Sequence, residues 1–161
     1  MSRSQKPRHK KRTPIFVNKN ACLIAIERAR VEREPVAEAF AAEFEMAALT
    51  ALDAITRGYG EKSQWDTLAN CLNHGWLLAK GGIGFEARPS FHLAHEAMRR
   101  MVPEFDASGK IAFVSDADKR TVEEALLLWS TQIRMATVGE IHDATQVVEK
   151  LYWQQPERRA A

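Results

Sequence analysis

From residue 20 onwards, apolar residues recur every three or four positions along the chain, which is the period of an amphipathic α-helix. Proline, glycine and capping residues interrupt this pattern at intervals and predict where helices begin and end. The six segments that result cover about 20–33, 35–57, 63–80, 90–102, 116–136 and 138–153. No pair of segments with alternating apolar and polar residues indicates a β-hairpin.

Local signals place the first four helices. Asn20 is a suitable cap for the first helix, and Pro35 fits the first turn of the second, where its missing N–H costs nothing. Ser63 and Asp66 have the spacing of a capping box for the third. Pro103 is expected to close the fourth helix, and residues 104–115 are expected to form a linker.

The later boundaries follow the same logic. Ser115 or Asp116 is predicted to cap the fifth helix, and Thr137 with Glu140 has capping-box spacing for the last. The run Gly81–Gly84 resembles a phosphate-binding loop only superficially, because it follows a helix and lacks the terminal Gly-Lys-Ser/Thr. We interpret it as the end of the third helix.

The apolar positions of these helices predict the core. Three tryptophans, Trp65, Trp76 and Trp129, fall on apolar stripes and are expected to be buried. The second helix carries one continuous stripe, made of Val36, Phe40, Phe44, Ala48, Leu52 and Ile55. The sequence therefore predicts an all-α fold, an antiparallel bundle of five to six helices.

A length of 161 residues fits one domain of this kind. We expect a disordered basic arm over residues 1–14, a single helical-bundle domain over 15–155 and a polar tail over 156–161. Residues 1–20 contain seven basic residues and no acidic one, although the net charge of the whole chain is only +2. The other 141 residues have 16 basic and 21 acidic residues, a net charge of −5.

The basic arm is the strongest functional feature of the sequence. Its five clustered cations, the candidate nucleic-acid-binding residues, are Lys6, Arg8, Lys10, Lys11 and Arg12. Such a cluster binds phosphates by releasing counterions, so we expect it to bind nucleic acid without reading sequence. Two alternatives remain open: the arm could keep the protein soluble, or it could bind an acidic protein.

The acidic body suggests a second hypothesis, in which the protein is an inhibitor or adaptor that binds a host protein. Glu38, Glu43 and Glu45 would form the contact surface and could mimic nucleic acid. Tyr152 and Trp153, an aromatic pair near the end of the last helix, could form a contact patch. The body could also form a homodimer.

Candidate catalytic and metal-binding groups are sparse. His92, His95 and Glu96 share a helix, but their order differs from the zinc motifs of metalloproteases. A third ligand would have to come from His74, His142 or a distant carboxylate. A polar helix face that continues through Arg99 and Arg100 is the simpler explanation. We therefore predict no metal, no cofactor, no catalytic residue and no enzymatic activity.

Two further features concern location. Cys22 and Cys71 lie far apart in sequence and outside any CxxC motif, which is typical of free thiols in a reducing compartment. No apolar run reaches the length of a signal-peptide core or of a membrane span. We expect a cytoplasmic protein that does not bind membranes.

Several short motifs together resemble a group of small, largely uncharacterised proteins encoded by prophages and mobile elements of proteobacteria. They are Lys6-Pro7-Arg8, Trp65-x-x-Leu68-Ala69-Asn70, Gly82-Ile83-Gly84, and Leu127-Leu128-Trp129 followed by Gln132. The resemblance implies an accessory protein that acts by binding nucleic acid or a host protein, including components of defence systems. It carries over no activity and no catalytic residue.

Overall fold

The computed structural model describes residues 19–153, so the predictions for residues 1–14 and 156–161 lie outside the described part. Within this range the chain forms seven α-helices and one 3-10 turn, and no β-strand. The elements are α1 (Lys19–Val31), α2 (Glu38–Thr56), α3 (Lys62–Gly81), η1 (Phe85–Ala87), α4 (Arg88–Arg100), α5 (Val102–Ser108), α6 (Asp116–Met135) and α7 (Val138–Trp153). The predicted all-α fold is confirmed.

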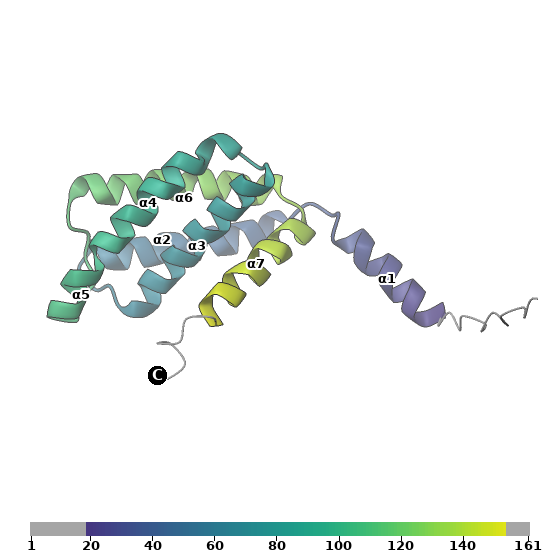
Figure 1. The fold of residues 1–161 in the computed structure, drawn as a ribbon, viewed down its shortest axis with the longest axis horizontal. Coiled ribbons are helices and arrows are strands. Elements are labelled where there is room, and N and C mark those ends of the chain that lie inside the picture. Colours follow the sequence, from purple (N-terminus) through teal and green to yellow (C-terminus); the bar gives the residue numbers. More distant parts are fainter. Residues whose placement is uncertain (1–18, 154–161) are drawn as a thin grey trace, which may run out of the picture.

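Helices α2–α7 form the bundle, and α1 extends away from it (Figure 1). Helix α3 is central, because it packs against α2, α4, α6 and α7. Helix α6 lies against α4 on one side and α2 on the other, and α7 covers α3. Short connections between helices that neighbour each other in sequence produce the predicted antiparallel arrangement.

The main core lies between α2, α3, α4 and α6. Trp129 is 1% exposed and belongs to this core, as predicted, together with Phe91 and Leu72. Trp65 and Trp76 are only partly buried and pack at its margin. A smaller cluster beneath α7 joins α3 to the end of α6; its buried members are Leu78, Ala136 and Ala144.

Two predictions at the start of the chain are wrong. Helix α1 begins at Lys19, so Asn20 lies inside the helix and is not its cap. Pro35 is not in a helix; it forms an isolated antiparallel bridge with Thr137. The neighbouring Val36 N–H donates to the carbonyl oxygen of Ala136 at 3.1 Å. This long-range pairing keeps the backbone extended and delays the start of α2 to Glu38.

The predicted start of α3 and the predicted linker after α4 also require correction. In α3 the box forms at Glu61, whose N–H donates to Gln64 Oε1 at 2.9 Å, so Ser63 lies within the first turn. Asp66 instead pairs with Lys62. Helix α4 ends at Arg100, three residues before Pro103, as expected. Pro103 itself lies in the first turn of α5, where a proline is tolerated, and α5 occupies the first part of the predicted linker, residues 104–115.

Three predicted boundaries are confirmed. Ser115 Oγ accepts the Asp118 N–H at 3.1 Å and caps α6. Glu140 Oε2 accepts the Thr137 N–H at 2.8 Å, and Thr137 Oγ1 accepts the Glu140 N–H at 3.3 Å, which completes the capping box of α7. Gly82 has a φ of 108°, the left-handed conformation that ends α3.

Candidate functional site

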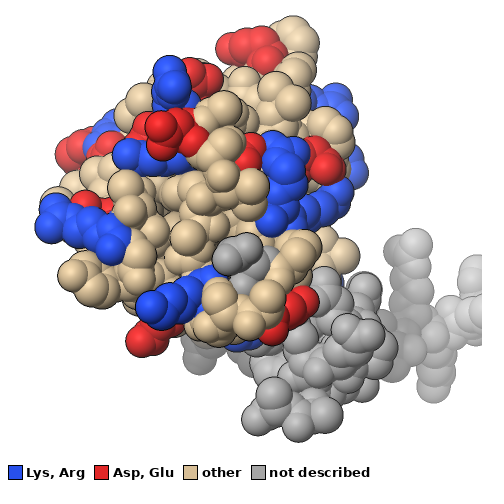
Figure 2. All heavy atoms as spheres, turned by 90° about the vertical axis from the view of Figure 1, so that its left-hand side faces the viewer, with Lys and Arg blue, Asp and Glu red and all other residues tan. Residues whose placement is uncertain are grey.

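The predicted nucleic-acid-binding residues Lys6, Arg8, Lys10, Lys11 and Arg12 lie outside the described residues. What the structure describes is the body to which they are attached. Residues 19–153 hold 15 basic and 20 acidic residues, a net charge of −5. In Figure 2, acidic and basic side chains lie next to one another around an uncharged centre, so this face carries no surface of one sign.

Most basic side chains of the body that lie in ion pairs contact an acid three or four residues away on the same helix. Examples are Arg57 with Asp53 and Lys62 with Asp66. Two others join different helices: Arg100 of α4 pairs with Asp118 of α6, and Arg134 of α6 pairs with two glutamates of α2. These pairs take up acidic and basic groups alike, so the body keeps its excess of acid.

The predicted acidic surface of Glu38, Glu43 and Glu45 is divided by the packing of α2. Arg134 Nε donates to Glu38 Oε1 at 3.1 Å, and Arg134 Nη2 donates to Glu45 Oε2 at 2.7 Å. Ser130 Oγ also donates to Glu45, at 2.8 Å. These bonds lower the pKa of Glu45 and hold both carboxylates against α6.

Glu43 lies on the opposite side of α2. It lines a hollow of about 390 Å³ between α2, α3 and α7, together with Phe44 and His74. Residues 38 and 43 are five positions apart, which turns their side chains well over 90° from each other around a helix with 3.6 residues per turn. The three glutamates therefore do not share one contact surface.

The other candidate protein-contact residues, Tyr152 and Trp153, form the last turn of α7. Their side chains lie outside the described part of the structure.

The histidines of α4 are engaged in different ways. His95 Nε2 lies 2.9 Å from Asn73 Oδ1 of α3, and burial lowers the pKa of His95. Glu96 pairs with Arg99, and His92 is exposed. Among residues 19–153, no group of three or more histidine, cysteine, aspartate and glutamate side chains is arranged to hold a metal ion.

Cys71 is buried on α3, and burial raises the pKa of its thiol to about 12. A thiol with such a pKa is almost entirely protonated at neutral pH, whereas nucleophilic attack requires the thiolate. Cys71 is therefore a core residue. Cys22 lies in α1, but the structure does not describe its side chain.

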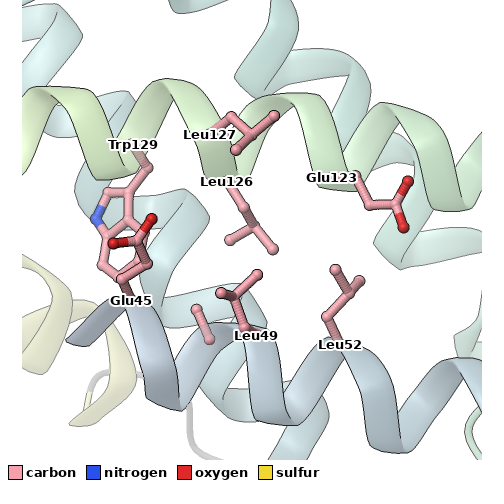
Figure 3. A pocket seen from close by; sticks show the side chains of 8 residues that line it. Glu45, Leu49, Leu52, Glu123, Leu126, Leu127 and Trp129 are labelled. Carbon is pink, nitrogen blue, oxygen red and sulfur yellow. The ribbon is translucent and has the colours of Figure 1, made fainter. Parts of the chain in front are cut away.

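An apolar groove between α2 and α6 is a feature that the sequence did not reveal. Its volume is about 280 Å³, and Figure 3 shows side chains of both helices facing each other across it. Leu49 is 46% exposed and Leu127 is 63% exposed, and Glu45 and Glu123 add carboxylates to its wall. Both leucines fall outside the core stripes. An apolar residue off the stripe of its helix is the one sequence feature from which this groove could have been predicted.

Comparison with protein-family models, curated proteins and solved structures finds no match to this chain. Across residues 19–153, no helix combines the length and the apolar character needed to span a bilayer.

Proposed function

We propose that this protein is a non-enzymatic, cytoplasmic accessory protein of a phage or mobile element that binds nucleic acid through its basic arm, residues 1–14. The observation that carries the proposal is the division of charge between seven basic residues in the first 20 positions and a body with a net charge of −5. Phosphate neutralisation by the arm supplies affinity without sequence preference.

The ion pairs of the body support this assignment. Eight of the 15 basic residues between 19 and 153 lie in ion pairs with acidic side chains. A polyanion therefore meets a body whose surplus charge repels it and an arm whose charge attracts it. The resemblance to prophage-encoded proteins favours a binding role of this kind.

A salt titration tests the proposal. Binding of a labelled DNA duplex, followed by fluorescence anisotropy, should weaken steeply as salt rises. If the arm neutralises five phosphates, log affinity falls against log salt with a slope of about −4 to −5. Duplexes of unrelated sequence should bind alike, because phosphate contacts carry no base information.

Two variants with the same loss of charge locate the binding site. In the first, the five arm cations Lys6, Arg8, Lys10, Lys11 and Arg12 become glutamine. In the control, the same change is made to five exposed bases of the body: Arg33, Arg88, Lys110, Arg120 and Lys150. The arm variant should lose binding and the control should retain it. Equal losses, or no binding by the wild type at low salt, would contradict the proposal.

The α2–α6 groove favours a second candidate function, an inhibitor or adaptor that binds a host protein such as a component of a defence system. The exposed leucines of this groove suit the apolar face of an amphipathic helix. A host protein should then co-purify with the wild type and with Leu93→Glu, a change on exposed α4 surface, but not with Leu127→Glu. Identical recovery with both variants would exclude the groove.

A further inference from the structure

Helix α1 lies outside the bundle with apolar side chains in solvent. Figure 1 shows it extending from the edge of the bundle near the start of α7. Ile24 is 68% exposed and Val31 is 41% exposed, and Leu23 beside them is also exposed. A helix of 13 residues is only marginally stable in water, and helices in proteins gain most of their stability by packing an apolar face. We therefore expect α1 to be stabilised by packing against another surface.

One face of α1 forms the wall of an apolar cleft beside α7. Its four central residues are spaced at i, i+3, i+4 and i+7, so they share a face: Ile24, Glu27, Arg28 and Val31. Val138 and His142 of α7 line the other side, and the volume is about 460 Å³. Two apolar residues thus flank a central pair of opposite charges, and Glu32, just after α1, adds a carboxylate that Arg28 binds within the same chain.

Backbone hydrogen bonds determine how α1 meets α7. The Gly139 N–H donates to the Glu32 carbonyl oxygen at 2.8 Å, and the Val138 N–H donates to the Glu34 carbonyl oxygen at 2.9 Å. A Cβ atom at Gly139 would lie 2.8 Å from the same Glu32 oxygen, so this approach requires glycine. These contacts between the segment after α1 and the start of α7 therefore fix the position of the cleft.

The cleft-lining face of α1 is complementary to itself in the antiparallel direction. When two copies of α1 align about a two-fold axis between residues 27 and 28, Ile24 faces Val31 of the second copy. In the same register Glu27 faces Arg28 of the second copy. Parallel alignment would instead place Glu27 against Glu27, which is unfavourable. Within one chain Arg28 pairs with Glu32 at 3.0 Å, an exposed contact that leaves the guanidinium able to bridge two carboxylates.

We propose that the protein forms a two-fold symmetric dimer in which the α1 helices pair antiparallel and each fills the cleft beside α7 of the other copy. An isologous contact of this kind needs one self-complementary patch, which is what this face provides. The dimer does not depend on the proposed function. If the arms do bind nucleic acid, the dimer joins two of them, and their combined avidity exceeds that of one arm.

The mass of the full chain in solution tests the proposal. Sedimentation velocity at increasing protein concentration should show twice the 18.2 kDa of the monomer. Ile24→Glu should give a monomer at the same concentrations, whereas Leu93→Glu on α4 should remain dimeric. Far-UV circular dichroism should show a folded bundle in both variants. A wild type that is monomeric at about 100 µM, where even interfaces of micromolar affinity assemble, would overturn the proposal. A dimer that Ile24→Glu leaves intact would do the same.

A charge exchange tests the antiparallel register. Glu27→Arg alone and Arg28→Glu alone each place like charges opposite each other and should weaken dimerisation by about tenfold or more. The double variant, Glu27→Arg with Arg28→Glu, restores opposite charges in the same register and should recover most of the affinity. A double variant that dimerises no better than the single ones would reject the antiparallel pairing.

Discussion

Gly75, in the middle of α3, determines how closely α3 and α4 can pack. A Cβ atom at this position would lie 2.3 Å from Cε1 of Phe91, a fully buried ring of α4. Glycine within a helix is intrinsically less stable than alanine by about 1 kcal/mol, so its presence here needs a compensating reason. The reason is space, because the phenyl ring occupies the volume that a methyl group would fill.

Gly75→Ala is therefore expected to lower the free energy of unfolding by about 1–3 kcal/mol despite the better helix propensity of alanine, because the ring cannot move without disturbing the core. Urea denaturation followed by circular dichroism measures the change. Gly81→Ala is the matched control: it lies in the same helix with no atom within 4 Å of the added Cβ, and it should be neutral or slightly stabilising.

The environment of Asp118 should make the stability of the protein depend on pH in the acidic range. Its carboxylate accepts hydrogen bonds from Arg100 of α4, which lower the pKa of Asp118 against the opposing effect of burial. A lowered pKa means that the folded protein favours the ionised form. The stabilisation is present above the ordinary carboxyl pKa near 4 and is lost as pH falls through the lower pKa of the folded state.

Asp118→Asn should thus cost about 1.5–3 kcal/mol at pH 7, the range of hydrogen bonds to charged groups. The difference from the wild type should shrink as pH falls below about 4, since the wild-type carboxylate then becomes protonated. Denaturant unfolding at a series of pH values provides the measurement. As a control, Asp143→Asn at an exposed position of α7 should leave the free energy of unfolding unchanged. If Asp118→Asn lowered the free energy of unfolding by the same amount at every pH, the role assigned to Asp118 would be wrong.

At the level of elements, α6 combines a regular inward-facing apolar stripe with a local cap. Its inward stripe runs through Val122, Ala125 and Trp129, all within the main core. Ser115 caps its start through a contact that lies within the helix's own first turn. Because each of these properties is local or periodic, the sequence predicted this helix closely.

Trp129→Ala should lower the free energy of unfolding by about 3–5 kcal/mol, the range for removal of a large buried aromatic side chain. Thermal unfolding followed at 222 nm reports the change. Leu127→Ala, two positions away and 63% exposed, should cost much less because most of its surface is already in water. A Trp129→Ala protein that melts like the wild type would reject the placement of this residue in the core.

At the scale of the whole molecule, we expect the part of the chain that stabilises the fold to differ from the part proposed to bind. Among residues 19–153, every buried member of the two core clusters lies between Val36 and Ala144. Residues 1–13 contain almost no apolar surface and carry six of the chain's 23 basic residues. A deletion in the arm is therefore expected to change nucleic-acid binding without changing the stability of the fold.

Deletion of residues 1–13 should leave the far-UV spectrum and the melting temperature unchanged. It leaves 17 basic and 21 acidic residues, so the same deletion should abolish binding of the DNA duplex. Anisotropy titration and a melting curve on one preparation measure both effects. A truncated protein that binds as tightly as the full chain would show that the body contacts the nucleic acid.

The sequence by itself determined the helical class, most helix positions and three boundary motifs. Helix periodicity and caps are interactions between residues at most four positions apart, so a linear pattern contains them. Thr137 and Glu140, for example, complete their box within one turn. The same argument failed at Pro35, where the partner, Thr137, is about a hundred residues away.

Only the tertiary structure decided which helix faces meet. Arg134 of α6 binds Glu38 of α2, which lies 96 positions away in the sequence. The groove of Leu49 and Leu127 and the cleft beside α1 likewise arise where distant helices lie side by side. A periodic pattern indicates which face of a helix is apolar. Which other helix covers that face depends on how all the helices pack together.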